Sequence, residues 1–172
     1  MPRLGATPYH LTVVTLRLRV VSGGQTGVDR AALDAALALG IAGGGWCPAG
    51  RWAEDGPIPA RYPLRETPSA DPAQRTLWNV RDSDATLVLS PQPPSGGTAL
   101  AGRAARQRGR PVLVMPPVST TLDDAAAWIA RAVPPGGTLN VAGPRESEAP
   151  GVGARARAWL DAALAAVVAG EP

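Results

Sequence analysis

Apolar runs that suit β-strands recur along the chain, separated by segments in which apolar residues follow a helical spacing. Four runs have the length of strands, and they cover residues 15–22, 85–90, 111–115 and 138–142. The runs at 85–90 and 111–115 are apolar almost throughout, which is typical of parallel strands that are buried on both faces. A fifth, shorter strand is expected at residues 41–42.

Five helices are predicted between and after these strands, at residues 26–39, 71–83, 98–108, 121–133 and 153–169. In the first of them the apolar residues recur at helical spacing, Thr26 is the expected N-cap and Gly40 provides the stop. Strands that alternate with helices in this way predict an α/β fold. We expect a Rossmann-like, doubly wound and mostly parallel sheet of about five or more strands, with helices on both faces.

Residues 43–70 interrupt this alternation. They show no hydrophobic periodicity, but they contain two tryptophans, a tyrosine and several charged side chains, which is a poor composition for a disordered segment. Structureless stretches of this length usually carry function or are disordered, so we expect an ordered loop in a ligand-binding or active site. The chain is otherwise expected to form one domain over residues 16–170, preceded by an N-terminal extension of residues 1–15.

The composition supports a globular protein and shows where its loops gather. Glycine and proline number 20 and 19 among the 172 residues, and 23 of these 39 fall in four segments: 22–27, 43–68, 90–97 and 143–153. A hydrophobic content of 45% argues against low-complexity disorder. The clustering of glycine and proline therefore marks these four segments as a candidate site.

Charge and rare residues exclude several classes of function. The net charge is +3 and all 17 basic residues are arginines, so the high isoelectric point predicts neither a nucleic-acid nor a membrane partner. The single cysteine, Cys47, excludes an internal disulfide, and the single histidine, His10, precedes the first strand. Neither a histidine-based triad nor a metal site is expected. Because we recognise no signal peptide or membrane-spanning run, we expect a cytoplasmic protein.

The loops that follow three of the predicted strands are polar and rich in glycine. In open parallel sheets, ligands bind beyond the carboxyl ends of the strands, where such loops meet. Paired glycines turn backbone amides toward a common point and a helix N-terminus adds partial positive charge, so these loops predict a phosphate site. The predicted binding residues are Ser22, Gly23, Gly24, Gln25, Thr26, Gly27, Asp29, Arg30, Ser95, Gly96, Gly97, Thr98, Asn140, Gly143 and Arg145. The competing interpretation is an ordinary strand–helix turn in each case or, for Arg145, an exposed ion pair.

Residues 43–70 supply candidates of another kind. Glu54 and Asp55 are adjacent carboxylates beside an apolar, proline-rich stretch that would raise a pKa for acid catalysis; a solvated turn is the alternative. Trp46 and Trp52 are candidates for stacking on a base or a pterin ring, with packing inside the loop as the alternative. The remaining tryptophans lie on predicted helices and are expected in the core: Trp78, Trp128 and Trp159.

Five long segments appear in an order that is specific to one protein family. They are SGGQTGVDRAALDAAL at 22–37, GGWCPAGRWAEDGPIPARYPLRET at 44–67, WNVRDSDATLVL at 78–89, SGGTAL at 95–100 and NVAGPRES at 140–147. Together they resemble the putative molybdenum carrier family, which belongs to the SLOG superfamily. The resemblance implies a Rossmann-like fold, a nucleotide or nucleotide-derived ligand on the glycine-rich loops, and assembly into dimers or tetramers. The family name reflects similarity to carriers of the molybdenum cofactor, a phosphorylated pterin.

Neighbours of this family in the superfamily are the lonely-guy phosphoribohydrolases, whose P-G-G-x-G-T-x-x-E motif supplies a catalytic glutamate. The stretch that resembles this motif, residues 95–102, contains no carboxylate. A hydrolase built on this chain would therefore need Glu54 or Asp55 as its acid.

Three functions are compatible with these features. The first is a binding or carrier protein that requires no cofactor of its own and takes the molybdenum cofactor, or another phosphorylated nucleotide-like or pterin compound, as its ligand. The alternative is a nucleoside-monophosphate phosphoribohydrolase that cleaves the N-glycosidic bond, with Asp29 or Arg30 assisting the acid. The third is an oligomeric interaction domain without a ligand. The expected partners are a phosphorylated small molecule and further copies of the chain, in a homo-oligomer.

Overall fold

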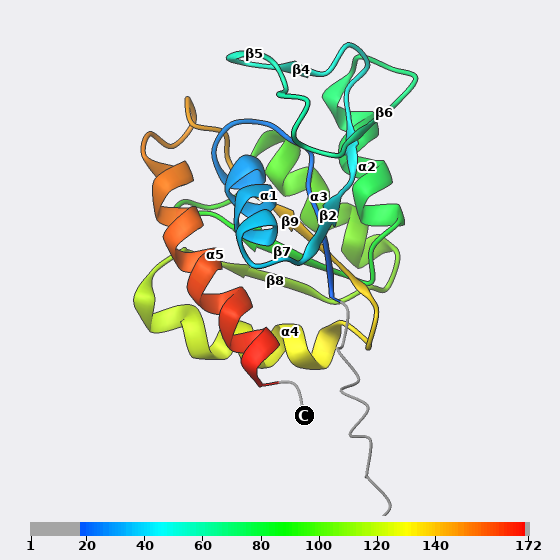
Figure 1. The fold of residues 1–172 in the computed structure, drawn as a ribbon. Coiled ribbons are helices and arrows are strands. Elements are labelled where there is room, and N and C mark those ends of the chain that lie inside the picture. The colour runs from blue at the N-terminus through cyan, green and yellow to red at the C-terminus, as the bar shows by residue number, and fades with distance from the viewer. Residues whose placement is uncertain (1–17, 171–172) are drawn as a thin grey trace, which may run out of the picture.

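A computed structural model of the protein describes residues 18–170, and a five-stranded sheet forms its centre (Figure 1). The strands lie in the order β2-β1-β9-β7-β8, and every neighbouring pair is parallel. Their bounds are Arg19–Val21 (β1), Ala42–Gly44 (β2), Ala85–Leu89 (β7), Val112–Met115 (β8) and Thr138–Ala142 (β9). The predicted parallel α/β sheet is confirmed. The N-terminal extension and the first three residues expected in β1 lie outside the described residues.

Helices cover both faces of the sheet, as predicted. Their bounds are Val28–Ala38 (α1), Pro72–Arg81 (α2), Gly96–Gln107 (α3), Leu122–Ala132 (α4) and Val152–Ala169 (α5), and a short 3₁₀ helix at Ser119–Thr121 (η1) precedes α4. Both α1 and α4 pack against α5 on one face, whereas α2 packs against α3 on the other (Figure 1). In the described chain, none of these helices combines the length and the apolar character that a membrane span requires.

The core lies between the central strands and the helices of the α5 face. All five residues of β7 are buried, and Leu139 of β9 and Leu160 of α5 have no exposed surface. Each leucine buried in this way stabilises the fold by about 1.5–3 kcal/mol. Because β7 and β9 pair on both edges and are covered on both faces, only apolar side chains fit there, which explains the continuous apolar runs in the sequence.

The last strand in the chain occupies the middle of the sheet. β9 pairs with β1 on one side and with β7 on the other. If the elements are taken in the order β9, α5, β1, α1, β2, β7, α3, β8, the spatial strand order becomes 3-2-1-4-5, which is that of a Rossmann sheet. The connectivity is therefore a circular permutation of a Rossmann sheet, and its switch point, where ligands bind in such folds, lies between β9 and β7.

Residues 43–70 are ordered, as expected, but they are not devoid of strands. Besides the end of β2 they hold four strands of two residues each: Trp46–Cys47 (β3), Trp52–Ala53 (β4), Gly56–Pro57 (β5) and Arg65–Glu66 (β6). β3 pairs with β6 and β4 with β5, in two small sheets. Strands of two residues are too short to produce a detectable alternation, so the sequence could not show them.

A small apolar cluster and one arginine hold this segment in place. The cluster packs Cys47, Ile58 and Tyr62 against Leu33 of α1. Arg51, which has a φ of 54°, donates hydrogen bonds to the carbonyl oxygens of four residues of the same segment, at 2.9 to 3.2 Å. The Arg51 guanidinium group thus supplies hydrogen-bond donors to carbonyl groups that a neighbouring strand would pair in a longer sheet.

Two local expectations are wrong. Thr26 does not cap α1, because the helix begins one residue later, with Gly27 in the N-cap position. Trp78 does not enter the core: it is half-buried on α2, where its ring meets that of Trp46 edge-on at 4.7 Å between centroids. The other two helical tryptophans behave as expected, since Trp159 is buried and Trp128 packs against the core.

The packing at the end of β9 predicts the effect of a single methyl group. A Cβ atom added at Gly143 would overlap the carbonyl oxygen of Leu89 and lie 2.5 Å from a methyl carbon of Val28, whereas one added at Gly97 would meet nothing within 4 Å. We expect Gly143→Ala to lower the free energy of unfolding by about 1–3 kcal/mol. Gly97→Ala should raise it by about 0.5–1 kcal/mol through the entropy of the unfolded chain. Chemical denaturation of both variants measures the difference, and equal stabilities would contradict it.

Candidate functional site

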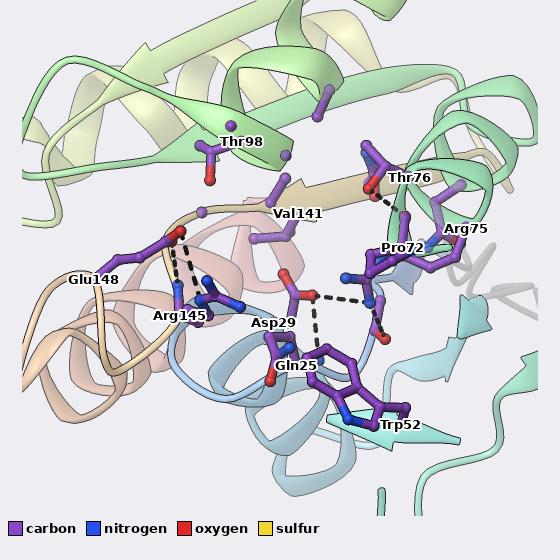
Figure 2. Close-up of a pocket in the computed structure, with 18 residues that line it drawn as sticks. Gln25, Asp29, Trp52, Pro72, Arg75, Thr76, Thr98, Val141, Arg145 and Glu148 are labelled. Atoms are coloured by element: carbon purple, nitrogen blue, oxygen red, sulfur yellow. Dashed lines mark hydrogen bonds and ion pairs between the residues drawn. The ribbon is translucent and has the colours of Figure 1, made fainter. Parts of the chain in front are cut away.

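A cavity of about 270 Å³ lies at the carboxyl edge of the sheet, beside the switch point (Figure 2). Residues 140–143, at the end of β9, line it, and the other walls come from helices on both faces. α1 contributes Asp29, α2 contributes Arg75, and the first turn of α3 contributes residues 96–98. Residues far apart in the sequence therefore meet around one small volume, in the place where open α/β sheets bind ligands.

The first turn of α3 is open toward this cavity. Within residues 18–170, no carbonyl group or side chain accepts a hydrogen bond from the amides of Gly96, Gly97 or Thr98. Ser95 makes no side-chain capping bond, and the first turn contains no acidic residue. A Cβ atom added at Gly96 or Gly97 would meet no atom within 4 Å. Free amides at the positive end of a helix dipole form a binding site for an anion.

The other helices that begin near the cavity are covered at their N-termini. The first amide of α1, that of Val28, donates to the Pro144 carbonyl oxygen at 3.3 Å. Glu146 caps α5 by accepting hydrogen bonds from the amides of Gly151 and Gly153. In α2, the Asp71 carboxylate accepts from the Ala73 amide at 2.9 Å. Of these four helices, α3 is therefore the one whose N-terminus is open to an anion in the cavity.

Most contacts of residues 22–27 are with other parts of the protein. The Ser22 hydroxyl donates to the Val141 carbonyl oxygen at 2.6 Å, which ties β1 to β9. The side-chain oxygen of Gln25 accepts hydrogen bonds from the amides of Thr26 and Glu54, both at 3.0 Å. Gly24 has a φ of 79° and would press any side chain into the apolar cluster of residues 43–70. Of this loop, Gly23 and Gln25 line the cavity.

Arg145 supplies a cationic side chain at the rim of the cavity. Its Nε lies 3.5 Å from a carboxylate oxygen of Glu148 and 3.5 Å from one of Glu54, and it makes no hydrogen bond within the described part of the chain. Figure 2 shows the guanidinium group between Glu148 and Asp29. An arginine with unused donors beside an open helix N-terminus suits a ligand that carries a phosphate.

Asp29 and Arg75 form a buried pair in the opposite wall. The Asp29 Oδ2 accepts a hydrogen bond from the Gln25 amide at 3.3 Å and lies 3.9 Å from Arg75 Nη1. Arg75 Nη1 also donates to the Gly23 carbonyl oxygen at 2.7 Å. Burial raises the pKa of Asp29 above its ordinary value, and the neighbouring Arg75 charge opposes that shift without cancelling it. The pair places a carboxylate and a guanidinium group together in the cavity wall.

Glu54 and Asp55 do not reach this cavity. Glu54 accepts hydrogen bonds from the side chains of Thr26 and Ser147 and from the Ser147 amide at 3.1 Å. The hydrogen bonds from Ser147 and then Thr26 hold the pKa of Glu54 below its ordinary value. Asp55 forms a two-pronged ion pair with Arg30, which lowers its pKa as well. The expectation of a raised pKa for acid catalysis is therefore wrong: both carboxylates anchor residues 43–70 to the rest of the fold.

The two tryptophans of residues 43–70 lie in different places. Trp52 borders the cavity with 47% of its surface exposed, and Figure 2 shows its indole ring near Asp29 and Gln25. Trp46 lies elsewhere, with its indole N–H donating to Asp82 at 2.7 Å and the Arg65 guanidinium 4.2 Å from its ring centre. Trp52 is thus available for stacking on a ligand in the cavity, and Trp46 is not.

The fifteen residues predicted to bind phosphate divide into two groups. The cavity is lined by Gly23, Gln25, Asp29, Gly96, Gly97, Thr98, Asn140, Gly143 and Arg145. The remaining six lie outside it: Ser22, Gly24, Thr26, Gly27, Arg30 and Ser95. Thr26 and Gly27 fall outside because the backbone of residues 144–145 covers the start of α1.

Arg75 and Glu148 line the cavity without having been predicted. Arg75 and Asn79 are four residues apart, so they lie on one face of α2, and both are buried. A pair of polar residues at this spacing is the signal that points to a polar wall. Glu148 follows the NVAGPRES segment by one residue, and nothing in its own pattern distinguishes it from a solvent-exposed carboxylate.

Comparison with known proteins gives two matches. Residues 20–164 match the model of the circularly permutated YpsA SLOG family, a description that agrees with the permuted strand order. The chain is also similar to the crystal structure, at 1.45 Å resolution, of a putative molybdenum carrier protein from Syntrophus aciditrophicus SB. The two sequences are 40% identical, the TM-score is 0.76, and the match covers 85% of this chain and 94% of that chain. No curated protein matches the chain.

The contacts of Glu54 predict a loss of stability on substitution. Glu54→Gln keeps the shape of the side chain but removes the charge that accepts from Thr26 and Ser147. We expect the free energy of unfolding at pH 7 to fall by about 1–2 kcal/mol, because hydrogen bonds to a partly exposed charge have this value. Glu66→Gln is the matched control, since its hydrogen bond with the Gly50 amide can persist. A Glu54→Gln protein as stable as the control would refute the anchoring role.

The buried Asp29 predicts a pH-dependent difference between the protein and Asp29→Asn. Because the folded pKa of Asp29 is raised, its contribution to stability is full below the ordinary pKa and is lost as the pH rises through the folded value. Asparagine cannot ionise, so the variant should gain stability relative to the parent as the pH rises from the ordinary aspartate pKa through the raised folded value. Denaturation curves of both proteins across this range test the trend. A constant difference would show that Asp29 does not titrate abnormally.

Proposed function

The chain belongs to the circularly permutated YpsA SLOG family, and from that premise we propose that it binds a phosphorylated, nucleotide-like or pterin ligand in the cavity at the switch point. The first turn of α3 carries the proposal, because three amides at the positive end of a helix are left without partners among the described residues. Arg145 would add charge at the phosphate. Trp52 would cover the flat ring of the ligand.

The size of the cavity and the charge around it fit a small ligand. A volume of about 270 Å³ is just below the usual range for small-molecule sites, so a mononucleotide or a single pterin phosphate suits it better than a dinucleotide. The similarity to a putative molybdenum carrier protein makes the molybdenum cofactor one candidate cargo. In that case the protein would hold the pterin phosphate at α3 and the ring beside Trp52.

The alternative, hydrolysis of a nucleoside monophosphate, has less support from the contacts of its candidate acids. Glu54 and Asp55 lie outside the cavity and are engaged with Ser147 and Arg30. The carboxylates that line the cavity, Asp29 and Glu148, are each next to an arginine. Binding requires only the groups that the cavity presents, and we therefore favour it over turnover.

Substitutions at the open helix end test the binding site directly. Gly97→Asp places a negative charge in the proposed phosphate position, where the added side chain has free space and complements the helix dipole. We expect calorimetric titration with AMP, ADP-ribose and the molybdenum cofactor to show binding by the parent protein to at least one of them. Gly97→Asp should lose that binding while its thermal stability is equal or higher.

Arg145→Ala should weaken the same binding by about 10-fold or more, as expected for loss of a charge-assisted hydrogen bond. Arg103→Ala is the matched control, because Arg103 is an exposed arginine on α3 that does not line the cavity. The proposal fails if none of the three compounds binds to the parent. It also fails if Gly97→Asp binds as well as the parent does.

A further inference from the structure

A second, smaller pocket lies between β1 and the C-terminal end of α2. Its volume is about 180 Å³, and its lining includes two arginines, Arg19 and Arg65, and the tryptophan that the switch-point cavity does not use, Trp46. One lining residue, Asn79, is shared with the switch-point cavity. The groups proposed to hold a phosphate at α3 line the first cavity alone, so the two pockets present different chemistry.

Trp46 forms a fixed wall of this pocket and orients Arg65. The Asn79 side chain accepts from the Trp46 amide at 2.8 Å and donates to the Trp46 carbonyl oxygen at 3.0 Å. The Arg65 guanidinium lies over the Trp46 ring, 4.2 Å from its centre. A guanidinium group stacked in this way uses its flat face, so the N–H groups in its plane remain available to a ligand.

Arg19 lines the same pocket from β1. Side chains alternate along a strand, so Arg19 lies on the α2 side of the sheet, whereas Leu18 and Val20 lie in the core on the other side. A Cβ atom added at Gly44 would lie 2.6 Å from Arg19 Nη2, so the guanidinium crosses β2 where glycine leaves room for it. Among residues 18–170, no carboxylate forms an ion pair with Arg19 or Arg65.

The carboxylate that lines the pocket, Asp82, is engaged elsewhere. Arg81 donates to both of its oxygens, at 2.7 and 3.0 Å, and the Trp46 indole N–H donates at 2.7 Å. The hydrogen bonds from Arg81 and then Trp46 hold the pKa of Asp82 below its ordinary value, against the opposing effect of burial. Because Arg81 balances the charge of Asp82, the pocket keeps the two positive charges of Arg19 and Arg65, which repel each other.

We propose that this pocket is a binding site for a small tetrahedral dianion, either a free phosphate ion or the phosphate group of a small ester. A dianion balances the two guanidinium charges, and their N–H groups suit oxyanions. The Thr138 hydroxyl, which also lines the pocket, would donate a further hydrogen bond. A volume of about 180 Å³ is well below that of ordinary small-molecule sites, so the pocket suits such an ion or ester rather than a nucleotide.

The test is a titration of the full chain at constant ionic strength, followed through the NMR signal of the Trp46 indole N–H. The probes are inorganic phosphate and glycerol 1-phosphate, and the Trp46→Phe variant identifies the signal. We expect a saturable shift in the parent protein. Tighter binding of inorganic phosphate would assign the free ion as the ligand, and tighter binding of glycerol 1-phosphate would assign the ester.

Arg19→Gln should weaken this binding by about 10-fold or more, because it removes a charge-assisted hydrogen bond. Arg103→Gln is the matched control, since it removes the same charge from an exposed position that lines neither pocket, and it should bind as the parent does. Gly44→Ala is a second variant, in which the added methyl group displaces the end of the flexible Arg19 side chain. It should also weaken binding, with little change in thermal stability.

The Gly97→Asp variant separates this site from the one proposed at α3. It blocks the α3 position and should leave the Trp46 shift unchanged. A shift that disappears in Gly97→Asp would report the α3 site and overturn this inference, while leaving the proposed function in place. The inference is also overturned if neither probe gives a saturable shift, or if Arg19→Gln binds as tightly as the parent protein. Failure of AMP, ADP-ribose and the molybdenum cofactor to bind would refute the proposed function alone.

Discussion

Strand β9 pairs on both of its edges, with β1 and with β7, and the central sheet depends on that double pairing. Without β9 the strands would fall into two separate pairs, each too small to bury a core. The same pairing brings Asn140, Gly143 and Arg145 to the middle of the carboxyl edge, beside loops from the first half of the chain. The permuted connectivity therefore couples the completion of the fold to the assembly of the cavity.

The helices around this edge differ in whether their N-termini are covered. Several helix N-termini lie there, and each one would attract a negative charge if it were exposed. The Pro144 carbonyl oxygen covers the start of α1, Glu146 covers α5 and Asp71 covers α2. The first turn of α3 has no such partner among the described residues. Under the proposed function, selectivity for one anion position would come from capping the other helix N-termini as much as from the open site itself.

Much of the fold could be predicted because it follows from local patterns. The buried strands appear as apolar runs. The Asp71-Pro72 pair marks the start of α2, because Asp71 is the N-cap and Pro72 is the first residue of the helix. The contacts made by Glu54 could not be predicted, because Ser147 is 93 residues away in the sequence. A carboxylate in a glycine- and proline-rich segment gives no sign of its distant partners. Its apolar neighbours in sequence suggested a raised pKa, whereas its neighbours in space lower it.

The two Gly-Gly segments show what the presence of glycine alone leaves open. Both Gly-Gly segments were predicted to bind phosphate, yet their surroundings differ: Gly24 and Gly27 are pressed against other parts of the chain, whereas Gly96 and Gly97 have free space. Glycine allows the backbone to approach a ligand or another segment of protein, and its presence alone does not distinguish the two. The packing of residues 58, 64 and 144 shows that Gly24 and Gly27 closely approach other segments of the protein.

The position of a bound phosphate is the most direct test of this account. A crystal structure of the protein with AMP or a pterin phosphate would show it. We expect phosphate oxygens within hydrogen-bond distance of the amides of Gly96, Gly97 and Thr98, with Arg145 turned toward them. A phosphate held instead by residues 22–27, or bound outside the cavity, would contradict it.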